Sequence, residues 1–559
     1  MLRLSSLTRW LRGGLNKWRV AFFVFAFSYG ALLLVNISYN SIMWDEVTHL
    51  TGGMYLLRGD FSSYFAFNAF YPPMFDLFTA AFFSIGGITV FSGRLVSVVF
   101  SFLSLYAVFE FTCRLYEPKI GLLASIFLGI MPGFVWLSRL AMIETMLIFF
   151  FTLSVLFFFM WLQNGKLAAL LLSGLTLGVG ILTKYQVIIG LAIMLTGLLI
   201  LDRGYLKSKL TRFPLILLTT FAVVVPWVLA SYQLYASGML DAWFYAATIG
   251  NPDKSLYSIG LNSAGGNRLP HFYIEIPSWL QLPIFYFLEM TEPYFNVHPI
   301  SLLPYLLGLG GIAMFMWRRK AADKYLLIWF FLVYVFFTII PNRHWRYVVP
   351  LFPVLAISAA CFLTYSLSIG KSIFKNKHLS PKEKHFALIP AVFLIAFTLV
   401  GVGFSVEQSY AWVQRSQVRI PIQEASNYVA TNIREGESVA VLCPQDMFSQ
   451  DIVRFYIEAQ GKNVYVWQYP QEPVDTYTPH FNATELVNLC RERNAKYVLL
   501  YEFSDAFGDN LTYFNSTLTF RDVYIMMSET GSFSAFDREG SREFGPYPPK
   551  RIFSFTFLG

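Results

Sequence analysis

The chain has 559 residues, of which 56% are hydrophobic and only 14% are charged, and its formal net charge is +8. Soluble domains carry about 25% charged residues, so this composition excludes an ordinary soluble protein and predicts a polytopic membrane protein. The basic residues stand in short clusters between apolar stretches, which argues against nucleic-acid binding despite the positive charge.

Eleven apolar stretches are candidates for membrane spans, each of which takes about 20 residues. In chain order they are 20–40, 94–113, 119–137, 143–163, 167–183, 187–201, 213–235, 301–317, 325–341, 347–368 and 386–405. A further stretch, 74–90, follows Pro72-Pro73 and contains Asp76, so we expect interfacial helices there, in the first external loop. If 74–90 does not cross the membrane, the clusters of basic residues between the spans fall on the cytoplasmic side, together with the N-terminus. The sequence thus predicts a polytopic α-helical membrane protein with about eleven spans, and at most thirteen.

The chain changes sides with each span, and this parity of the span count puts several charged residues on the external face, at the ends of predicted spans. They are Asp45, Glu46, Glu144, Lys184, Arg343 and Arg346. Carboxylates at a lipid boundary are costly and therefore indicate a functional site that faces water. The plainer alternatives are first-turn acids for the carboxylates and interfacial anchors for the cations.

The region 406–559 differs in kind from the apolar part, 1–405. Three expected strands, 438–443, 463–469 and 496–501, alternate with expected helices over 447–460 and 482–494, with Asn482 as an N-cap. This alternation predicts a soluble α/β domain with a parallel sheet. Parity places the domain outside, as do the sequons at Asn482, Asn510 and Asn515. Because no glycine-rich phosphate loop is present, we expect a supporting or acceptor-contacting domain.

Acids and bases gathered at one membrane face suit the transfer of a sugar from a lipid-linked phosphate. Lys and Arg would stabilise the charge that develops on the leaving phosphate. The acceptor hydroxyl needs a general base, which Asp45 would supply. A single in-line displacement would invert the anomeric centre.

A divalent metal is a second hypothesis for this face. His49 lies four residues after Asp45, so the two share a helix face, and His271 would be a third ligand. Two histidines do not define a metal site, and no other cofactor is indicated.

Seven short motifs occur in one order along residues 15–370. They are Asp45-Glu46, Tyr71-Pro72-Pro73-Met74, Arg94-Leu95, Arg139 to Glu144, Leu182-Thr183-Lys184, the stretch from His271-Phe272-Tyr273 to Pro277, and Arg346-Tyr347 with Pro350. This ordered set resembles type C membrane glycosyltransferases, specifically the family 39-like protein O-mannosyltransferases and lipid A aminoarabinose transferases.

The resemblance implies a polyprenyl- or dolichyl-phosphate sugar donor, a hydroxyl acceptor on a protein, glycan or lipid, and inversion at the external face. Asp45 would be the base, with Glu46 and Glu144 positioning it or the acceptor. The residues implied to bind the lipid phosphate and sugar are Lys184, Arg346, Tyr347, Arg343 and His271. The implied location is the cell membrane of a prokaryote, or the endoplasmic reticulum in a eukaryote.

The chain departs from this family at two places. It has Glu144 where many members have Asp, and Phe70-Tyr71 where the aminoarabinose transferases have Glu-Lys. The second departure argues against an aminoarabinose substrate and against the metal contact of those enzymes. Two rival functions remain: a flippase or transporter of lipid-linked sugars, and an oligosaccharyltransferase that uses a lipid pyrophosphate. A transporter predicts ionisable residues at mid-membrane depth, whereas these lie at span ends.

Overall fold

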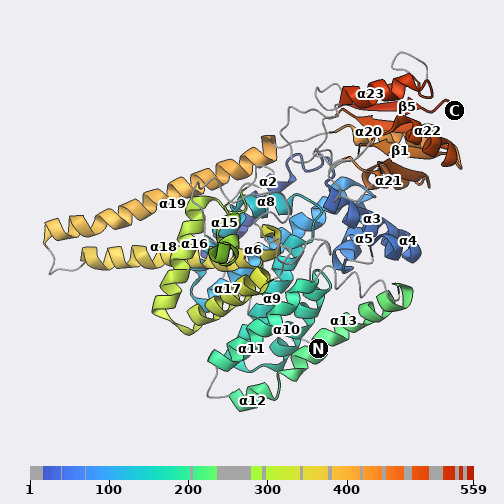
Figure 1. Ribbon diagram of the computed structural model, residues 1–559. Helices are drawn as coiled ribbons and strands as arrows, with labels where there is room; N and C mark the ends of the chain where they lie inside the picture. Colours follow the sequence, from blue (N-terminus) through green and yellow to red (C-terminus); the bar gives the residue numbers. More distant parts are fainter. Residues whose placement is uncertain are drawn as a thin grey trace. The chain divides into compact units, whose positions relative to one another are not determined.

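The structure is a computed structural model. It describes residues 17–39, 41–68, 71–201, 206–235, 278–291, 298–339, 344–375, 380–415, 420–443, 448–470, 481–502, 520–534, 541–544 and 551–559. These residues group into two compact units. Figure 1 labels their helices and strands. Unit 1 is Met1–Val35, Asn68–Phe75 and Arg94–Arg415; unit 2 is Asn36–Phe67, Asp76–Gly93 and Ser416–Gly559. Part of the first loop therefore belongs to the same unit as the C-terminal region.

Unit 1 is helical, and the predicted polytopic helical class is confirmed. In the described part of the chain, seven helices are long and apolar enough to cross a membrane. They are α2 (Lys17–Leu34), α6 (Val90–Leu115), α9 (Glu144–Asn164), α13 (Pro214–Tyr235), α17 (Ala321–Ile339), α18 (Leu351–Lys375) and α19 (Pro381–Arg415). The count of eleven spans stays a prediction.

The other expected spans appear as shorter or broken apolar helices. The stretch 119–137 is a pair, α7 (Pro118–Gly129) and α8 (Pro132–Ser138), bent by 72° where Pro132 opens the second helix. Proline lacks the N–H of a continuing helix, which accounts for the break. The rest are α10 (Leu167–Ile181), η1 (Tyr185–Ile188) with α11 (Ile189–Leu201), and α16 (Leu302–Arg318). Unit 1 also contains two short α-helices, α12 (Leu206–Leu210) and α15 (Ser278–Glu289).

Glycines let neighbouring helices of unit 1 approach closely. A Cβ built on Gly311 of α16 would lie 2.1 Å from the backbone carbonyl oxygen of Ser358 in α18. The Ser358 hydroxyl in turn donates to the Gly308 carbonyl oxygen at 2.8 Å. Small residues at such crossings are how helices pack in a membrane, where lipid supplies no hydrophobic drive for association.

Gly311→Ala is therefore expected to destabilise unit 1 by about 1–3 kcal/mol, because a backbone atom cannot move aside as a side chain can. The measurement is the thermal unfolding temperature in detergent. Gly403→Ala in α19 is the matched control, since nothing lies within 4 Å of a Cβ there. Equal unfolding temperatures for the two variants would contradict the close approach.

Unit 2 contains a five-stranded sheet in the order β2-β1-β3-β5-β4. The strands are β1 (Ser438–Leu442), β2 (Tyr465–Tyr469), β3 (Ala495–Tyr501), β4 (Arg542–Phe544) and β5 (Ile552–Thr556). β1 pairs in parallel with β2 and β3, and β5 pairs antiparallel with β3 and β4. All residues of β1 and β5 are buried. The three strands predicted from the sequence are therefore present and parallel.

Seven described helices belong wholly or mainly to unit 2. From the C-terminal region come α20 (Ile422–Asn432), α21 (Gln450–Ala459), α22 (Ala483–Glu492) and α23 (Phe520–Glu529). From the first loop come α3 (Trp44–Arg58), α4 (Phe61–Asn68) and α5 (Met74–Gly86). The predicted cap is present, because the Asn482 side-chain oxygen accepts from the backbone N–H groups of Thr484 and Glu485 at 3.0 and 3.2 Å. Of the predicted sequons, Asn510 and Asn515 lie outside the described residues.

Candidate active site

The Asp45-Glu46 pair forms the first turn of α3 in unit 2, and its two acids have different surroundings. Glu46 is fully buried, and its Oε2 accepts from the backbone N–H of Met43 at 3.0 Å. The Glu46 N–H donates back to the Met43 carbonyl oxygen at 3.0 Å, which completes a reciprocal cap on the helix. Asp45 is half-buried in the same turn, where the helix dipole favours a carboxylate. Glu46 thus holds the turn that carries Asp45.

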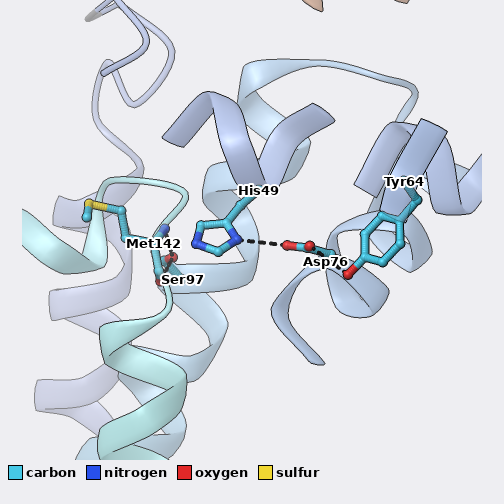
Figure 2. A network of polar contacts seen from close by, with 5 residues as sticks. All are labelled: His49, Tyr64, Asp76, Ser97 and Met142. Atoms are coloured by element: carbon cyan, nitrogen blue, oxygen red, sulfur yellow. Dashed lines mark hydrogen bonds and ion pairs between the residues drawn. The ribbon is translucent and has the colours of Figure 1, made fainter. Parts of the chain in front are cut away.

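One turn further along α3, His49 belongs to a buried polar network (Figure 2). Its Nδ1 lies 2.8 Å from Oδ1 of Asp76, in the first turn of α5. The other Asp76 oxygen, Oδ2, accepts from the Tyr64 hydroxyl of α4 at 3.1 Å. Asp76 and Tyr64 are fully buried and His49 is nearly so. Because a buried carboxylate needs partners, this network fastens α3, α4 and α5 to one another.

The network also bears on the metal hypothesis. His49 uses one ring nitrogen for Asp76, and His271 lies outside the described residues. Within the described ranges, no group of three or more His, Cys, Asp or Glu side chains is arranged to hold a metal ion. The hypothesis therefore gains no support from the described part of unit 2.

Asp76→Ala is expected to lower the stability of unit 2 by about 1–3 kcal/mol, since it leaves the buried partners His49 and Tyr64 unsatisfied. Asp76→Asn is the matched variant, because its amide can still bond both partners. Its unfolding temperature in detergent should fall by less than half as much. If the two variants fall equally, the charge of Asp76 matters and its hydrogen bonds do not.

In unit 1, Glu144, Lys184 and Tyr347 come together from three helical segments. Glu144 is the first residue of α9, Lys184 precedes η1, and Tyr347 lies in η3 (Trp345–Val348). Lys184 Nζ lies 3.4 Å from Glu144 Oε1 and 5.2 Å from the centre of the Tyr347 ring. The second Glu144 oxygen, Oε2, is buried and has no hydrogen-bond partner among the described residues. A buried carboxylate oxygen left open in this way is suited to bind a ligand hydroxyl.

Arg346 adds a second cation to this cluster. Its Nη1 lies 3.8 Å from the Met142 sulfur, two residues before Glu144, and its backbone N–H donates to His344 Nδ1 at 3.2 Å. Burial first, and then the positive charges of Arg346 and Lys184, hold the pKa of His344 well below its usual value. His344 is therefore neutral here, and Lys184 and Arg346 are the cations beside it. Arg343 lies outside the described residues.

Backbone contacts fix the loops that carry this cluster. The Met74 N–H, directly after Pro72-Pro73, donates to the Leu182 carbonyl oxygen at 3.0 Å, so two of the sequence motifs meet. Ser97 of α6 and the Met142 backbone exchange hydrogen bonds of 3.1 and 3.3 Å. Ser97 could not be recognised from the sequence, because a serine in an apolar span carries no distinctive signal.

Arg139, the first residue of the Arg139-to-Glu144 motif, has a structural partner. Its Nη1 donates to the Leu33 carbonyl oxygen at 2.6 Å, near the C-terminal end of α2. Carbonyl groups at a helix end lack partners within the helix, and a cation there is favourable. The motif thus fastens the loop before α9 to the first predicted span.

A family model and several known proteins are similar to this chain. A family model described as dolichyl-phosphate-mannose-protein mannosyltransferase matches residues 71–229, a range that includes Glu144 and Lys184. Two curated relatives are both undecaprenyl phosphate-alpha-4-amino-4-deoxy-L-arabinose arabinosyl transferases. The one from Edwardsiella ictaluri is 26% identical over 36% of this chain and 32% of its own length. The one from Aeromonas hydrophila is 25% identical over 51% of this chain and 48% of its own length. The chain thus spans a third to a half of these relatives.

Solved structures match nearly the whole chain. ArnT from Cupriavidus metallidurans in the apo state has a TM-score of 0.62 at 15% identity, covering 97% of this chain and 98% of that one. The same protein bound to undecaprenyl phosphate gives 0.60 at 14% identity, with the same coverage. The Archaeoglobus fulgidus oligosaccharyltransferase tethered to an acceptor peptide gives 0.56 at 14% identity, covering 87% and 69%. The predicted resemblance to type C membrane glycosyltransferases is confirmed, and these structural matches establish the fold.

Proposed function

We propose that this chain is an integral-membrane glycosyltransferase that moves a sugar from a polyprenyl-phosphate donor to a hydroxyl acceptor, with inversion. The observation that carries the proposal is the cation cluster of unit 1. Lys184 lies between Glu144 and the Tyr347 ring, with Arg346 and the neutral His344 beside it. Two cations gathered in a largely buried setting suit an anionic ligand such as a lipid phosphate. The similarly folded Cupriavidus protein was solved with undecaprenyl phosphate.

The charge balance of the reaction explains why cations are needed. The donor phosphodiester carries about one negative charge, and the departing polyprenyl phosphate carries close to two once the anomeric carbon–oxygen bond breaks. Lys184 and Arg346 would stabilise that added charge, so the leaving group needs no proton. Tyr347 would place Lys184, while Arg343 and His271 remain proposed sugar or phosphate contacts.

Asp45 is the proposed general base. The acceptor oxygen attacks the anomeric carbon from the face opposite the phosphate, and its proton passes to the Asp45 carboxylate. Glu46 would support Asp45 by capping the turn in which both stand. The open Oε2 of Glu144 would accept a hydrogen bond from a substrate hydroxyl.

The distribution of basic residues supports the proposed membrane topology. We place the N-terminus in the cytoplasm, count eleven spans, and put Asp45 and residues 406–559 on the external face. The sugar and the acceptor stay unassigned, and Phe70-Tyr71 argues against aminoarabinose.

The test is transfer by purified protein from a panel of radiolabelled polyprenyl-phosphate sugars. The proposal predicts turnover with at least one monophosphate donor. Turnover only with pyrophosphate-linked donors would favour an oligosaccharyltransferase. Movement of labelled donor across vesicle membranes, without transfer to any acceptor, would favour a flippase.

A further inference from the structure

Helix α3, which begins with Asp45 and Glu46, is held just before its start by the C-terminal region of unit 2. Ser41, three residues ahead of α3, exchanges two hydrogen bonds with the backbone of Ile420. The Ile420 N–H donates to Ser41 Oγ at 2.7 Å, and Ser41 Oγ donates to the Ile420 carbonyl oxygen at 3.3 Å. Both residues are buried. The chain that enters α3 is thereby fixed to the segment that leads into α20.

The last turn of α3 is held by Glu458, near the end of α21. The Tyr55 hydroxyl donates to Glu458 Oε1 at 3.3 Å, and Arg58 Nη1 lies 3.9 Å from Oε2. Arg58 also donates to the Glu458 backbone carbonyl oxygen. Glu458 is buried, so its carboxylate depends on these two partners. Contacts with the C-terminal region therefore bracket α3 at both ends.

The anchoring helix α21 is itself rooted in the sheet. It packs on β1, β2 and α20, and it buries Ile452, Val453 and Phe455. Its first turn is capped by the Ser449 hydroxyl, which accepts from the Ile452 N–H at 3.4 Å. Figure 1 shows α21 beside α3, and the two helices are in contact. A shift of the sheet and α21 would thus carry α3 with it.

We propose that the C-terminal α/β domain is a positioning domain for the catalytic helix: through Glu458 and Ile420 it fixes the orientation of α3 and so of Asp45. This inference rests on the proposed function for its catalytic consequence. A helix of 15 residues, as α3 is, has marginal stability alone in water. A general base must nevertheless be held to within about half an ångström of its working position. The bracketing contacts supply the constraint that α3 lacks by itself.

The first test measures the anchoring without any substrate. Hydrogen exchange of the backbone amides of α3 is compared among wild type, Glu458→Ala and Tyr55→Phe. The inference predicts that opening of α3 becomes about tenfold more frequent in Glu458→Ala and changes less in Tyr55→Phe, with β1 and β3 still protected. Unchanged exchange in α3 would overturn the inference.

The matched control is Glu502→Gln. The Glu502 carboxylate accepts hydrogen bonds from Arg551 at 2.6 and 2.7 Å. The substitution therefore removes a carboxylate from the same unit and leaves the bracketing contacts intact. It should leave exchange in α3 as in the wild type. If Glu458→Ala fails to fold, Tyr55→Phe loses a single hydroxyl and still tests the same contact.

The second test uses kcat of sugar transfer as a measure of how well Asp45 is positioned. Glu458→Ala should lower kcat about ten- to a hundredfold, since a misplaced catalytic group costs that much, while the donor KM changes less than twofold. Glu458→Gln should recover part of kcat, because its amide oxygen can accept from Tyr55. A loss confined to stability, with kcat of the folded fraction unchanged, would overturn the positioning role. If the wild type transfers no sugar, the proposed function fails, and the exchange experiment still decides the anchoring.

Discussion

Asp45→Asn is expected to lower kcat by about 10²- to 10⁴-fold, with a small change in donor KM. The amide is nearly isosteric but cannot accept a proton from the acceptor hydroxyl at neutral pH, and general-base catalysis contributes a factor of this size. The half-buried position of Asp45 in the first turn of α3 should tolerate the amide, so the unfolding temperature should stay close to that of the wild type. The measurement is single-turnover transfer of labelled sugar with saturating donor.

Asp60→Asn is the matched control for this substitution. Asp60 stands in the same loop, and its Oδ1 accepts from the Ser63 N–H at 3.0 Å. Hydrogen bonds from the Ser63 side chain, and then from its backbone N–H, hold the pKa of Asp60 below its ordinary value. Asn caps a helix about as well as Asp, so this variant should keep wild-type kcat. Full activity in Asp45→Asn would remove Asp45 from the role of base.

Lys184→Gln is expected to lower kcat/KM for the donor by about 10²- to 10³-fold, the usual cost of losing one group that stabilises developing charge. The same change leaves Glu144 as a buried carboxylate without its cation, which should also destabilise unit 1. Lys184→Arg keeps the charge over the Tyr347 ring and should retain more activity. Initial rates across donor concentrations separate the loss in kcat from the loss in binding.

Lys324→Gln supplies the comparison for this experiment. Lys324 is exposed near the start of α17, in one of the basic clusters that parity assigns to the cytoplasmic side. Its charge should not affect transfer. A loss in Lys184→Gln no greater than the loss in Lys324→Gln would show that the lysine serves the membrane interface and not the phosphate.

The elements of unit 2 that local sequence specifies were predicted well. β1 contains the uninterrupted apolar run Val439 to Leu442, and Asn482 stands directly before a helical stretch whose amides it caps. Periodicity and capping act within a few residues, so they are visible in sequence. The antiparallel strands β4 and β5 were not predicted, because β5 pairs with β3, about 50 residues earlier in the chain, and β4 joins the sheet only through β5.

Side-chain partners that are distant in sequence escaped prediction. His49 was considered as a metal ligand, whereas its described partner is Asp76, 27 residues later. The signal available was Asp76 itself, an acid within an apolar stretch that had to find a partner. Glu46 was assigned to catalysis with Asp45, yet its side chain caps the helix, and its catalytic role remains a prediction. Nothing in the local sequence of α3 indicates that this helix belongs to the same compact unit as the sheet.

The discontinuity of unit 2 has a consequence for how the protein is made. Residues 36–67 and 76–93 leave the ribosome early, but the sheet that completes their unit ends with β5, at Thr556. Contacts over such a separation are slow to form and leave apolar surface exposed in the meantime. The ribosome therefore synthesises most of unit 1 after α3 and before α21, the helix that holds α3. A stop codon that deletes β5 would therefore also leave the helices of the first loop without the complete sheet of their unit.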